Sequence, residues 1–262
     1  MDTRKIRRVI RQIEKYSNLQ EAEIVGLGNF SGLQKVSVLE CEFLIKKMIS
    51  LEMGKAELSG LSALRDLTKN VPQAHGPFED DGEVFIVLEY IEPSISKDSL
   101  SICKTMKSVY SQKGNYWGWD SDNFVGSLKQ TNSKHEDFLS YFMQDRIEPL
   151  IRLTYNSHLI DLSLKNRIES LVSSKSSEWG LGKIFPRLIH GDLWSGNIIQ
   201  SKNGNAYLID PSVSYGHPEQ DFAMSLLFGG TPTQWIESIR EDLELEEGFS
   251  ERISFWQIYP LL

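Results

Sequence analysis

The chain has 262 residues, of which 40% are hydrophobic and 24% charged, a composition typical of a globular protein with a packed core. Its 28 basic and 36 acidic residues give a formal net charge of −8, which argues against a nucleic-acid-binding surface. The two cysteines, Cys41 and Cys103, are far apart and indicate neither a disulfide framework nor a zinc site. No apolar run reaches the length of a membrane span. We therefore expect a cytoplasmic protein that binds neither nucleic acid nor membranes, with a monomer as the favoured state.

The N-terminal residues 4–15 have the pattern of an amphipathic helix. Ile6, Val9, Ile10 and Ile13 recur at helical spacing, and basic residues occupy the positions between them. We interpret the basic residues as the solvated side of this helix. The alternative is a patch that binds a partner.

Residues 24–48 contain short β-prone runs separated by glycines, which predicts hairpins. Gly26, Gly28 and Gly32 could let backbone N–H groups approach a triphosphate. Their spacing, G-x-G-x-x-x-G, departs from the stricter kinase pattern, and glycines also serve ordinary hairpins.

The next segments predict a helix and a hairpin. From Ser50 to Lys69 the apolar residues follow a period of 3.6, which indicates a helix with a leucine stripe. Residues 71–93 then predict a strand, a turn at Asp81-Gly82 and a hydrophobic strand that ends near Glu89.

Beyond Pro93 the periodicity is mostly helical, so we place a boundary near residue 92, with a β-rich part at 1–92 and a helical part at 93–262. The helical patterns cover residues 97–112, 135–155 and 159–175. One further hairpin is predicted, with strands at 198–200 and 206–209 and a turn at Asn203-Gly204.

The residues around this hairpin have the spacing of a phosphoryl-transfer site. Asp192 and Asn197 lie five positions apart, and Asp210 follows Asp192 by eighteen at the end of a strand. In a kinase catalytic loop the first Asp accepts the proton of the acceptor hydroxyl, and the Asn and the second Asp bind magnesium. Taken singly, each could be an ordinary turn or cap residue. Together they indicate phosphoryl transfer.

A kinase also needs a strand lysine with a carboxylate partner. Strand alternation separates Lys46 from Phe43, Ile45 and Lys47, and favours Lys46 over Lys47 as the phosphate-binding lysine. Glu57 lies at the margin of the leucine stripe and would form an ion pair with Lys46, although a solvated helix position is the alternative.

The segment from Glu89 to Ile91 lies at the junction of the two predicted parts. Its backbone is where adenine would hydrogen-bond in a kinase. The alternative is a plain linker.

Together these residues resemble the fructosamine kinase (ketosamine 3-kinase) family. HGDLWSGN at 190–197 and DPSVSYGHPEQDFAMSLLFGG at 210–230 are similar to the two most specific motifs of that family, and weaker similarities occur at 116–132, 141–147 and 251–262. The resemblance implies an α+β, bilobal protein-kinase-like fold with a small β-rich N-lobe and a larger helical C-lobe. It also implies ATP and Mg²⁺ as cofactors.

The resemblance implies a role for each of these residues. Asp192 would be the base, Asn197 and Asp210 the metal ligands, and Lys46 with Glu57 the nucleotide-positioning pair. The implied acceptor is the 3-hydroxyl of a ketosamine sugar, such as fructosamine or ribulosamine, free or on a protein lysine.

Some implied positions lie outside this set. Asp221 would brace the catalytic loop. Trp194, Tyr215 and His217 are candidates for the acceptor site, and packing is the alternative for each.

Two other functions remain open from the sequence. One is a kinase for another small hydroxyl compound, such as choline or an aminoglycoside. The other is an inactive kinase-fold binding module, against which the retention of Lys46, Asp192, Asn197 and Asp210 argues.

Overall fold

The computed structural model describes residues 1–20, 23–30, 32–95, 98–229, 233–243, 245 and 247–262. By its internal contacts the chain divides into two compact units. The first unit comprises residues 1–95 and 199–210, and the second comprises residues 96–198 and 211–262.

This division differs from the boundary expected near residue 92, because the hairpin at 199–210 groups with the first unit. The backbone explains the difference. Ser94 N–H donates to the Gln200 carbonyl at 2.6 Å, and Leu208 N–H donates to the Asn70 carbonyl at 3.0 Å. Helical periodicity on both sides of the hairpin had assigned it to the helical part.

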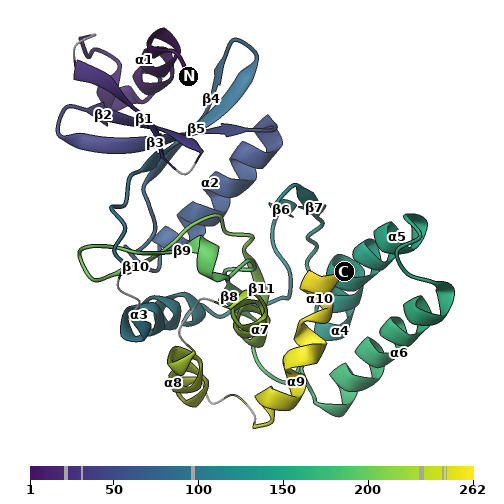
Figure 1. Cartoon of the computed structure of the whole chain (residues 1–262). Coiled ribbons are helices and arrows are strands. Elements are labelled where there is room, and N and C mark those ends of the chain that lie inside the picture. The colour runs from purple at the N-terminus through teal and green to yellow at the C-terminus, as the bar shows by residue number, and fades with distance from the viewer. Residues whose placement is uncertain (21–22, 31, 96–97, 230–232, 244, 246) are drawn as a thin grey trace. The chain divides into compact units, whose positions relative to one another are not determined.

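The first unit is built on an antiparallel sheet with the strand order β1-β2-β3-β5-β4 (Figure 1). Its strands are β1 (Ile24–Phe30), β2 (Leu33–Val38), β3 (Cys41–Met48), β4 (Ala74–Asp80) and β5 (Glu83–Glu89). Asp81 and Gly82 form the β4–β5 turn with φ of 51° and 72°, left-handed values that this Asp-Gly pair tolerates. The predicted hairpin is confirmed.

Helix α1 (Thr3–Arg11), followed by the short η1 (Glu14–Tyr16), covers one face of this sheet. Its isoleucines and valine are buried against Phe43 and Ile45, which confirms the predicted apolar side. On its polar side, Arg8 Nε donates to Asp80 at 2.6 Å, and Lys5 pairs with Glu83. Part of the basic run therefore binds the unit's own acidic β4–β5 hairpin.

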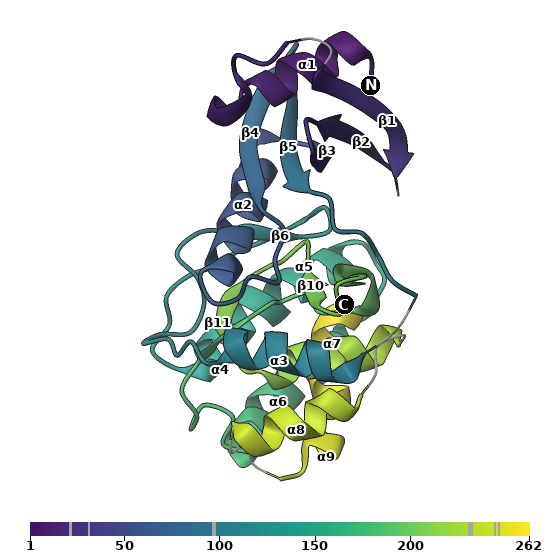
Figure 2. The same ribbon diagram turned by 90° about the vertical axis from the view of Figure 1, so that its left-hand side faces the viewer.

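Helix α2 (Leu51–Arg65) packs against β4 and β5 (Figures 1 and 2). Ser50 caps it by accepting a hydrogen bond from Met53 N–H at 3.1 Å. The predicted helix at 50–69 is confirmed, although it ends at Arg65. The unit is completed by β9 (Ile198–Gln200) and β10 (Ala206–Leu208), which confirm the second predicted hairpin.

The second unit is mainly helical and also contains several three-residue strands. Its elements are α3 (Ser99–Tyr110), β6 (Asn123–Val125), β7 (Leu128–Gln130), α4 (Phe138–Tyr141), η3 (Phe142–Ile147), α5 (Glu148–Asn156), α6 (Leu162–Glu178), β8 (Arg187–Ile189), η4 (Ser195–Asn197), β11 (Ser214–Gly216), α7 (Glu219–Phe228), α8 (Gln234–Asp242), α9 (Phe249–Trp256) and α10 (Ile258–Leu261). The three predicted helical stretches are confirmed. The pairs β6–β7 and β8–β11 were not predicted, because three-residue strands show no period and no Asn-Gly or Asp-Gly turn joins these pairs, as Asn203-Gly204 joins β9 to β10.

Aromatic side chains fill the core of the second unit. Phe138 and Phe142 stack with ring centroids 5.3 Å apart, and Trp256 meets Phe138 edge-on at 5.7 Å. These contacts join α4, η3 and α9, although α4 and α9 are distant in sequence.

Two expectations from composition can be compared with the described residues. Cys41 is exposed and Cys103 is buried, and neither forms a disulfide. Among the described residues, no helix is both long enough and apolar enough to span a membrane.

Candidate active site

Three charged side chains of the first unit meet on the sheet face opposite α1. Lys46 Nζ donates to both carboxylate oxygens of Glu57, at 2.9 and 2.8 Å, and to Asp210 Oδ1 at 2.8 Å. The predicted Lys46–Glu57 ion pair is therefore present. Lys47 points to the other face and binds Glu83.

In this cluster two carboxylates share one lysine. Burial raises the pKa of Glu57 to about 7, since the attraction of Lys46 offsets the loss of water only in part and Asp210 repels the negative charge. For Lys46, burial alone would lower the pKa, but the two carboxylates together outweigh it and raise the pKa above its ordinary value. Lys46 thus stays charged at neutral pH. The side chain of Asp210 is 43% exposed, against 11% for Glu57, so Asp210 is the member open to a ligand.

Two of the three glycines predicted to approach a triphosphate, Gly26 and Gly28, differ in their surroundings. A Cβ at Gly26 would lie 3.0 Å from Ile6 Cδ1, so packing of α1 favours glycine there. Gly28 has φ of 93° at a β-bulge and faces open space, which leaves its backbone accessible. Ser31 of this segment lies outside the described residues.

The two residues predicted to bind adenine lie at and just after the end of β5. Glu89 N–H donates to the Gln73 carbonyl at 2.8 Å, and its carboxylate accepts from Gln73 N–H at 3.0 Å. Ile91 is buried. The end of β5 is therefore held rigidly, and adenine binding here stays a prediction.

In the second unit, Asp221 on α7 braces the backbone of the catalytic loop. Its carboxylate accepts from His190 N–H at 2.8 Å, from Gly191 N–H at 2.9 Å and from the Tyr110 hydroxyl at 3.0 Å. Burial raises the pKa of Asp221 to about 6, although these three hydrogen bonds oppose the shift. The bracing contact implied for Asp221 is present, and it fixes the backbone just before Asp192.

Asp192 and Asn197 are joined directly within the same loop. The Asn197 side-chain amide donates to the Asp192 carbonyl at 2.8 Å and to Asp192 Oδ2 at 2.9 Å. Asn197 is 5% exposed, so its amide has little freedom to turn. This pair of hydrogen bonds orients the Asp192 carboxylate.

The predicted metal ligands supply the oxygen donors that Mg²⁺ prefers. Because Asn197 uses its amide nitrogen on Asp192, its Oδ1 points elsewhere and accepts no hydrogen bond from a described residue. Asp210 offers a half-exposed carboxylate. Within the described ranges no group of three or more His, Cys, Asp or Glu side chains could hold a metal. Asn197 and Asp210 each offer an oxygen of the kind that Mg²⁺ binds, and this ion usually keeps waters and phosphate oxygens among its ligands.

A cavity of about 410 Å³ in the second unit is bordered by Asp192, a volume within the range of small-molecule sites. Its lining contains both apolar and polar side chains. The apolar residues include Val125, Leu128, Leu150, Met224, Phe228 and Pro260, and the polar residues include Gln130, Asp145, Arg146, Asp192 and Tyr259.

Trp194 is the predicted acceptor residue that lines this cavity. Its ring lies 5.9 Å from that of Phe228 and is 37% exposed, with an open aromatic surface. A Cβ at Gly196 would come within 2.3 Å of the indole, so glycine at this position allows the ring to fold over the loop.

Tyr215 and His217 do not belong to the described lining of this cavity, and their place at the acceptor site stays a prediction. Tyr215 packs against Tyr116 and Trp119, with centroid distances of 5.4 Å to each. His217 is 4% exposed and lies 4.9 Å from Trp256. Burial lowers its pKa to about 4, so it is a neutral core residue at neutral pH. Sequence proximity to the motif does not decide where a side chain points.

The sequence did not single out several polar residues of the cavity. Asp145 and Arg146 come from η3, and Gln130 from β7 bonds to the Tyr259 hydroxyl near the C-terminus. An adjacent Asp-Arg pair within an apolar helical pattern could have indicated Asp145 and Arg146. No local sequence pattern predicts the contact of Gln130 with Tyr259, because the two residues are far apart in the chain.

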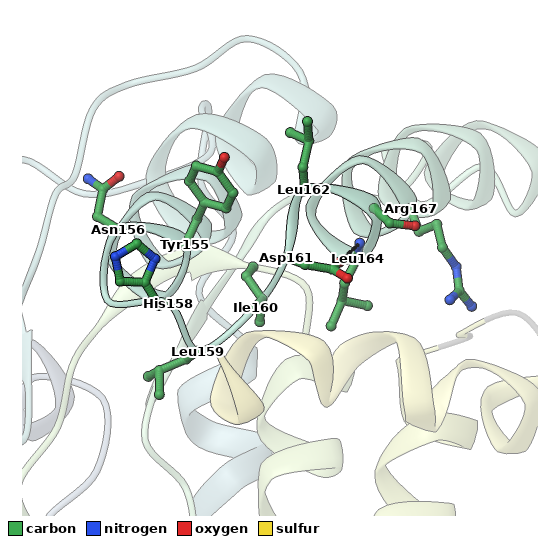
Figure 3. Close-up of a pocket in the computed structure, with 10 residues that line it drawn as sticks. Tyr155, Asn156, His158, Leu159, Ile160, Asp161, Leu162, Leu164 and Arg167 are labelled. Carbon is green, nitrogen blue, oxygen red and sulfur yellow. Dashed lines mark hydrogen bonds between the residues drawn. The ribbon is translucent and has the colours of Figure 1, made fainter.

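A wider hollow of about 790 Å³ lies at the loop between α5 and α6 (Figure 3). Leu159 and Leu162 are exposed there, and Asp161 caps α6 by accepting from Leu164 N–H at 2.7 Å. No predicted site residue lines it, so volume alone does not identify the active site.

Comparison with known proteins connects this geometry to a family. A profile described as fructosamine kinase matches residues 1–262. A probable ketoamine kinase of Enterococcus faecium is 34% identical over 215 residues, which cover 79% of this chain and 74% of that protein. Gly230, the last residue of the second motif, lies outside the described residues.

Solved structures show the same fold. A protein named as a fructosamine-3-kinase from Haemophilus somnus superposes with a TM-score of 0.83 at 24% identity, covering 98% of this chain and 90% of that one. The aminoglycoside phosphotransferase APH(4)-Ia, crystallised with AMP-PNP and hygromycin B, gives a TM-score of 0.61 at 10% identity, covering 94% and 86%. The predicted protein-kinase-like fold, with a β-rich N-terminal sheet and a helical C-terminal part, is confirmed. Because the family profile matches residues 1–262 of the chain and the probable ketoamine kinase is 34% identical over 79% of it, the chain belongs to the fructosamine kinase family.

Proposed function

We propose that this protein transfers the γ-phosphoryl group of ATP to the 3-hydroxyl of a ketosamine sugar, such as fructosamine or ribulosamine. The observation that carries the proposal is a cavity of about 410 Å³ bordered by both Asp192 and Trp194, in a chain of the fructosamine kinase family. The reaction breaks the bond between the γ-phosphorus of ATP and the β–γ bridging oxygen, which leaves with ADP. It forms a bond from that phosphorus to the sugar oxygen.

The first unit supplies the groups for the nucleotide. Lys46, held by Glu57 at 2.8 Å, would bind phosphate oxygens in exchange for its contact with Asp210. Asp210 and Asn197 would hold Mg²⁺, which when bound neutralises charge on the phosphates. Exchanging one anion for another at Lys46 keeps the lysine paired throughout.

The second unit supplies the groups for the acceptor. Asp192, oriented by the Asn197 amide at 2.9 Å, would accept the proton of the sugar hydroxyl as the oxygen attacks. Asp221 acts as a positioning residue because it holds the two backbone N–H groups before Asp192. Trp194 offers an aromatic face on which a sugar ring can lie.

The other candidate functions have less support. A choline or aminoglycoside kinase would share the fold, but the family profile covers the whole chain. An inactive module has no chemical need for the Lys46–Glu57–Asp210 cluster, in which burial raises the pKa of Glu57 to about 7. Two carboxylates that share one lysine repel each other, and a bound cation would relieve this repulsion.

The test is an acceptor panel with purified protein, ATP and Mg²⁺, following ADP release. Fructose-lysine and ribulose-lysine should be phosphorylated far better than free fructose, choline or an aminoglycoside, because a polar site rejects analogues that lack its partners. The Asp192→Asn variant should lose about 10²-fold or more in turnover while magnesium-dependent ATP binding persists. Robust turnover of choline or an aminoglycoside, with none on any glycated amine, would overturn the substrate assignment.

A further inference from the structure

Asp145 is a second carboxylate in the acceptor cavity, and the mechanism above does not use it. It lies on η3, a π-helical segment between α4 and α5, and its side chain is 4% exposed. Both Asp145 and Asp192 line the cavity. A carboxylate is costly to bury unless it is paired, so its partners decide what it can do.

The two oxygens of Asp145 have different surroundings. Oδ2 accepts from Ser133 N–H at 2.8 Å and lies 3.0 Å from His135 Nε2. A carboxylate accepts only, so this imidazole nitrogen carries the hydrogen. Among the described residues, Oδ1 accepts no hydrogen bond. One oxygen is thus anchored, whereas the other has no donor among the described residues, and the side chain lines the cavity.

Arg146, which follows Asp145 in the chain and also lines the cavity, has other partners. Arg146 donates to the carbonyls of Thr131 and Asp145, at 3.0 and 3.2 Å, and to Asn132 Oδ1 at 2.7 Å. Its guanidinium also lies 4.8 Å from the centre of the Tyr141 ring. None of these contacts reaches a carboxylate oxygen. Within the described part of the chain, the Asp145 carboxylate therefore has no guanidinium partner.

We infer that Asp145 binds the ammonium group of the ketosamine and determines the preference for amine-linked sugars. The inference rests on the proposed function. The nitrogen of a ketosamine is a secondary amine that carries a proton at neutral pH, and it is attached close to the hydroxyl that reacts. A substrate whose hydroxyl reaches Asp192 therefore brings a cation to a second acceptor in the same cavity. Asp145 Oδ1 accepts a charge-assisted hydrogen bond from it.

This arrangement separates the reacting group from the recognition group. Asp192 contacts the hydroxyl, whereas Asp145 distinguishes a glycated amine from a neutral sugar. Leu128 and Leu150 also line the cavity and offer apolar surface for the substituent of the amine.

The experiment compares two acceptors that differ in one atom: N-butyl-1-amino-1-deoxyfructose and its ether analogue 1-O-butylfructose. The wild-type protein should favour the amine by about 10- to 100-fold in kcat/KM, the discrimination expected from one hydrogen bond to a charged group. Asp145→Asn should remove this preference by lowering kcat/KM for the amine, with the ether unaffected and the KM for ATP unchanged.

Asp137→Asn is the matched control. Asp137 caps α4 by accepting from Ser140 N–H at 2.8 Å and is not in the described lining, so this variant should keep the wild-type preference. An Asp145→Asn variant whose kcat/KM falls equally for both acceptors would indicate a structural role and overturn the inference. A variant that keeps the wild-type preference for the amine would also overturn it.

A wild-type protein that turns over the amine and the ether equally would also overturn the inference, even if the variant failed to fold. If the protein phosphorylates neither of these acceptors and no other ketosamine, both the proposed function and the inference are wrong.

Discussion

Two buried glutamates, one in each unit, have opposite electrostatic surroundings. Glu219 in the second unit accepts from Arg252 at 2.8 and 2.6 Å and from Trp256 Nε1 at 2.8 Å. Burial alone would raise its pKa, but the hydrogen bonds and charge of Arg252 outweigh burial and lower the pKa. Glu57 in the first unit shares a single lysine with Asp210, and burial raises its pKa to about 7.

The difference separates a charge cluster whose pairing is complete from one that could accept a ligand. In the Glu219 cluster, one cation and an indole N–H satisfy one carboxylate, so no charge is left for a ligand. In the Lys46 cluster two carboxylates share one cation, and Asp210 is half-exposed. Incomplete pairing at an accessible position is what a magnesium–nucleotide complex can complete.

The largest expected effect comes from breaking the Glu219 cluster, in which the carboxylate is fully paired. Arg252→Met should lower the free energy of unfolding by about 3–5 kcal/mol, because it leaves the Glu219 charge buried without its cation. Denaturant titration measures this loss. Lys175→Met, which breaks an exposed pair with Glu178, is the control and should cost at most about 1 kcal/mol. Equal losses in the two variants would contradict the structural role of Arg252.

Breaking the Lys46 cluster, in which two carboxylates share one lysine, should affect activity more than stability. Lys46→Met should reduce kcat/KM for ATP by about 10²-fold, since a charged donor to the phosphates is lost. Its stability should fall less than that of Arg252→Met, because Glu57 with a pKa of about 7 can take up a proton. The control is Lys47→Met, whose lysine binds Glu83 on the other face of the sheet. If Lys46→Met retained full activity, the nucleotide role of Lys46 would be wrong.

The smallest effect is a pH dependence of the free energy of unfolding, and it comes from His217, which lies beside Glu219. The pKa of His217 is lowered from 6.5 to about 4 by burial. Between these values the unfolded chain binds a proton that the folded chain does not, so stability falls as pH falls, by about 1.4 kcal/mol per pH unit. The folded protein keeps the full contribution above pH 6.5.

The measurement is the difference in unfolding free energy between wild type and His217→Gln from pH 7 to pH 5. This difference should shrink as the pH falls. Taking a difference is necessary because Asp221, with its pKa raised to about 6, acts with the opposite sign between pH 4 and pH 6. A difference that stays constant with pH would show that His217 is not buried as a neutral group.

Much of the candidate site was predictable from local sequence. The alternation of β3 separates Lys46 from Lys47, and helical periodicity places Glu57 toward the same side, so the observed ion pair follows from two short patterns. The spacing of Asp192 and Asn197 fixes a loop short enough for the amide to reach the carboxylate, as it does at 2.9 Å. Hairpins at Asp81-Gly82 and Asn203-Gly204 were predictable because few residue pairs tolerate such turns.

The sequence by itself therefore determined the spacing of the candidate catalytic residues, the buried faces of α1 and β3, and the succession of a β-rich part and a mainly helical part. Only the tertiary structure decided which side chains surround the acceptor cavity. Trp194 lines it while His217 is buried in the aromatic core, and Asp145 joins Asp192 from a helical segment distant in sequence. The physical reason is that dihedral preferences and periodicity act over a few residues, whereas a cavity wall forms where elements distant in the chain pack together.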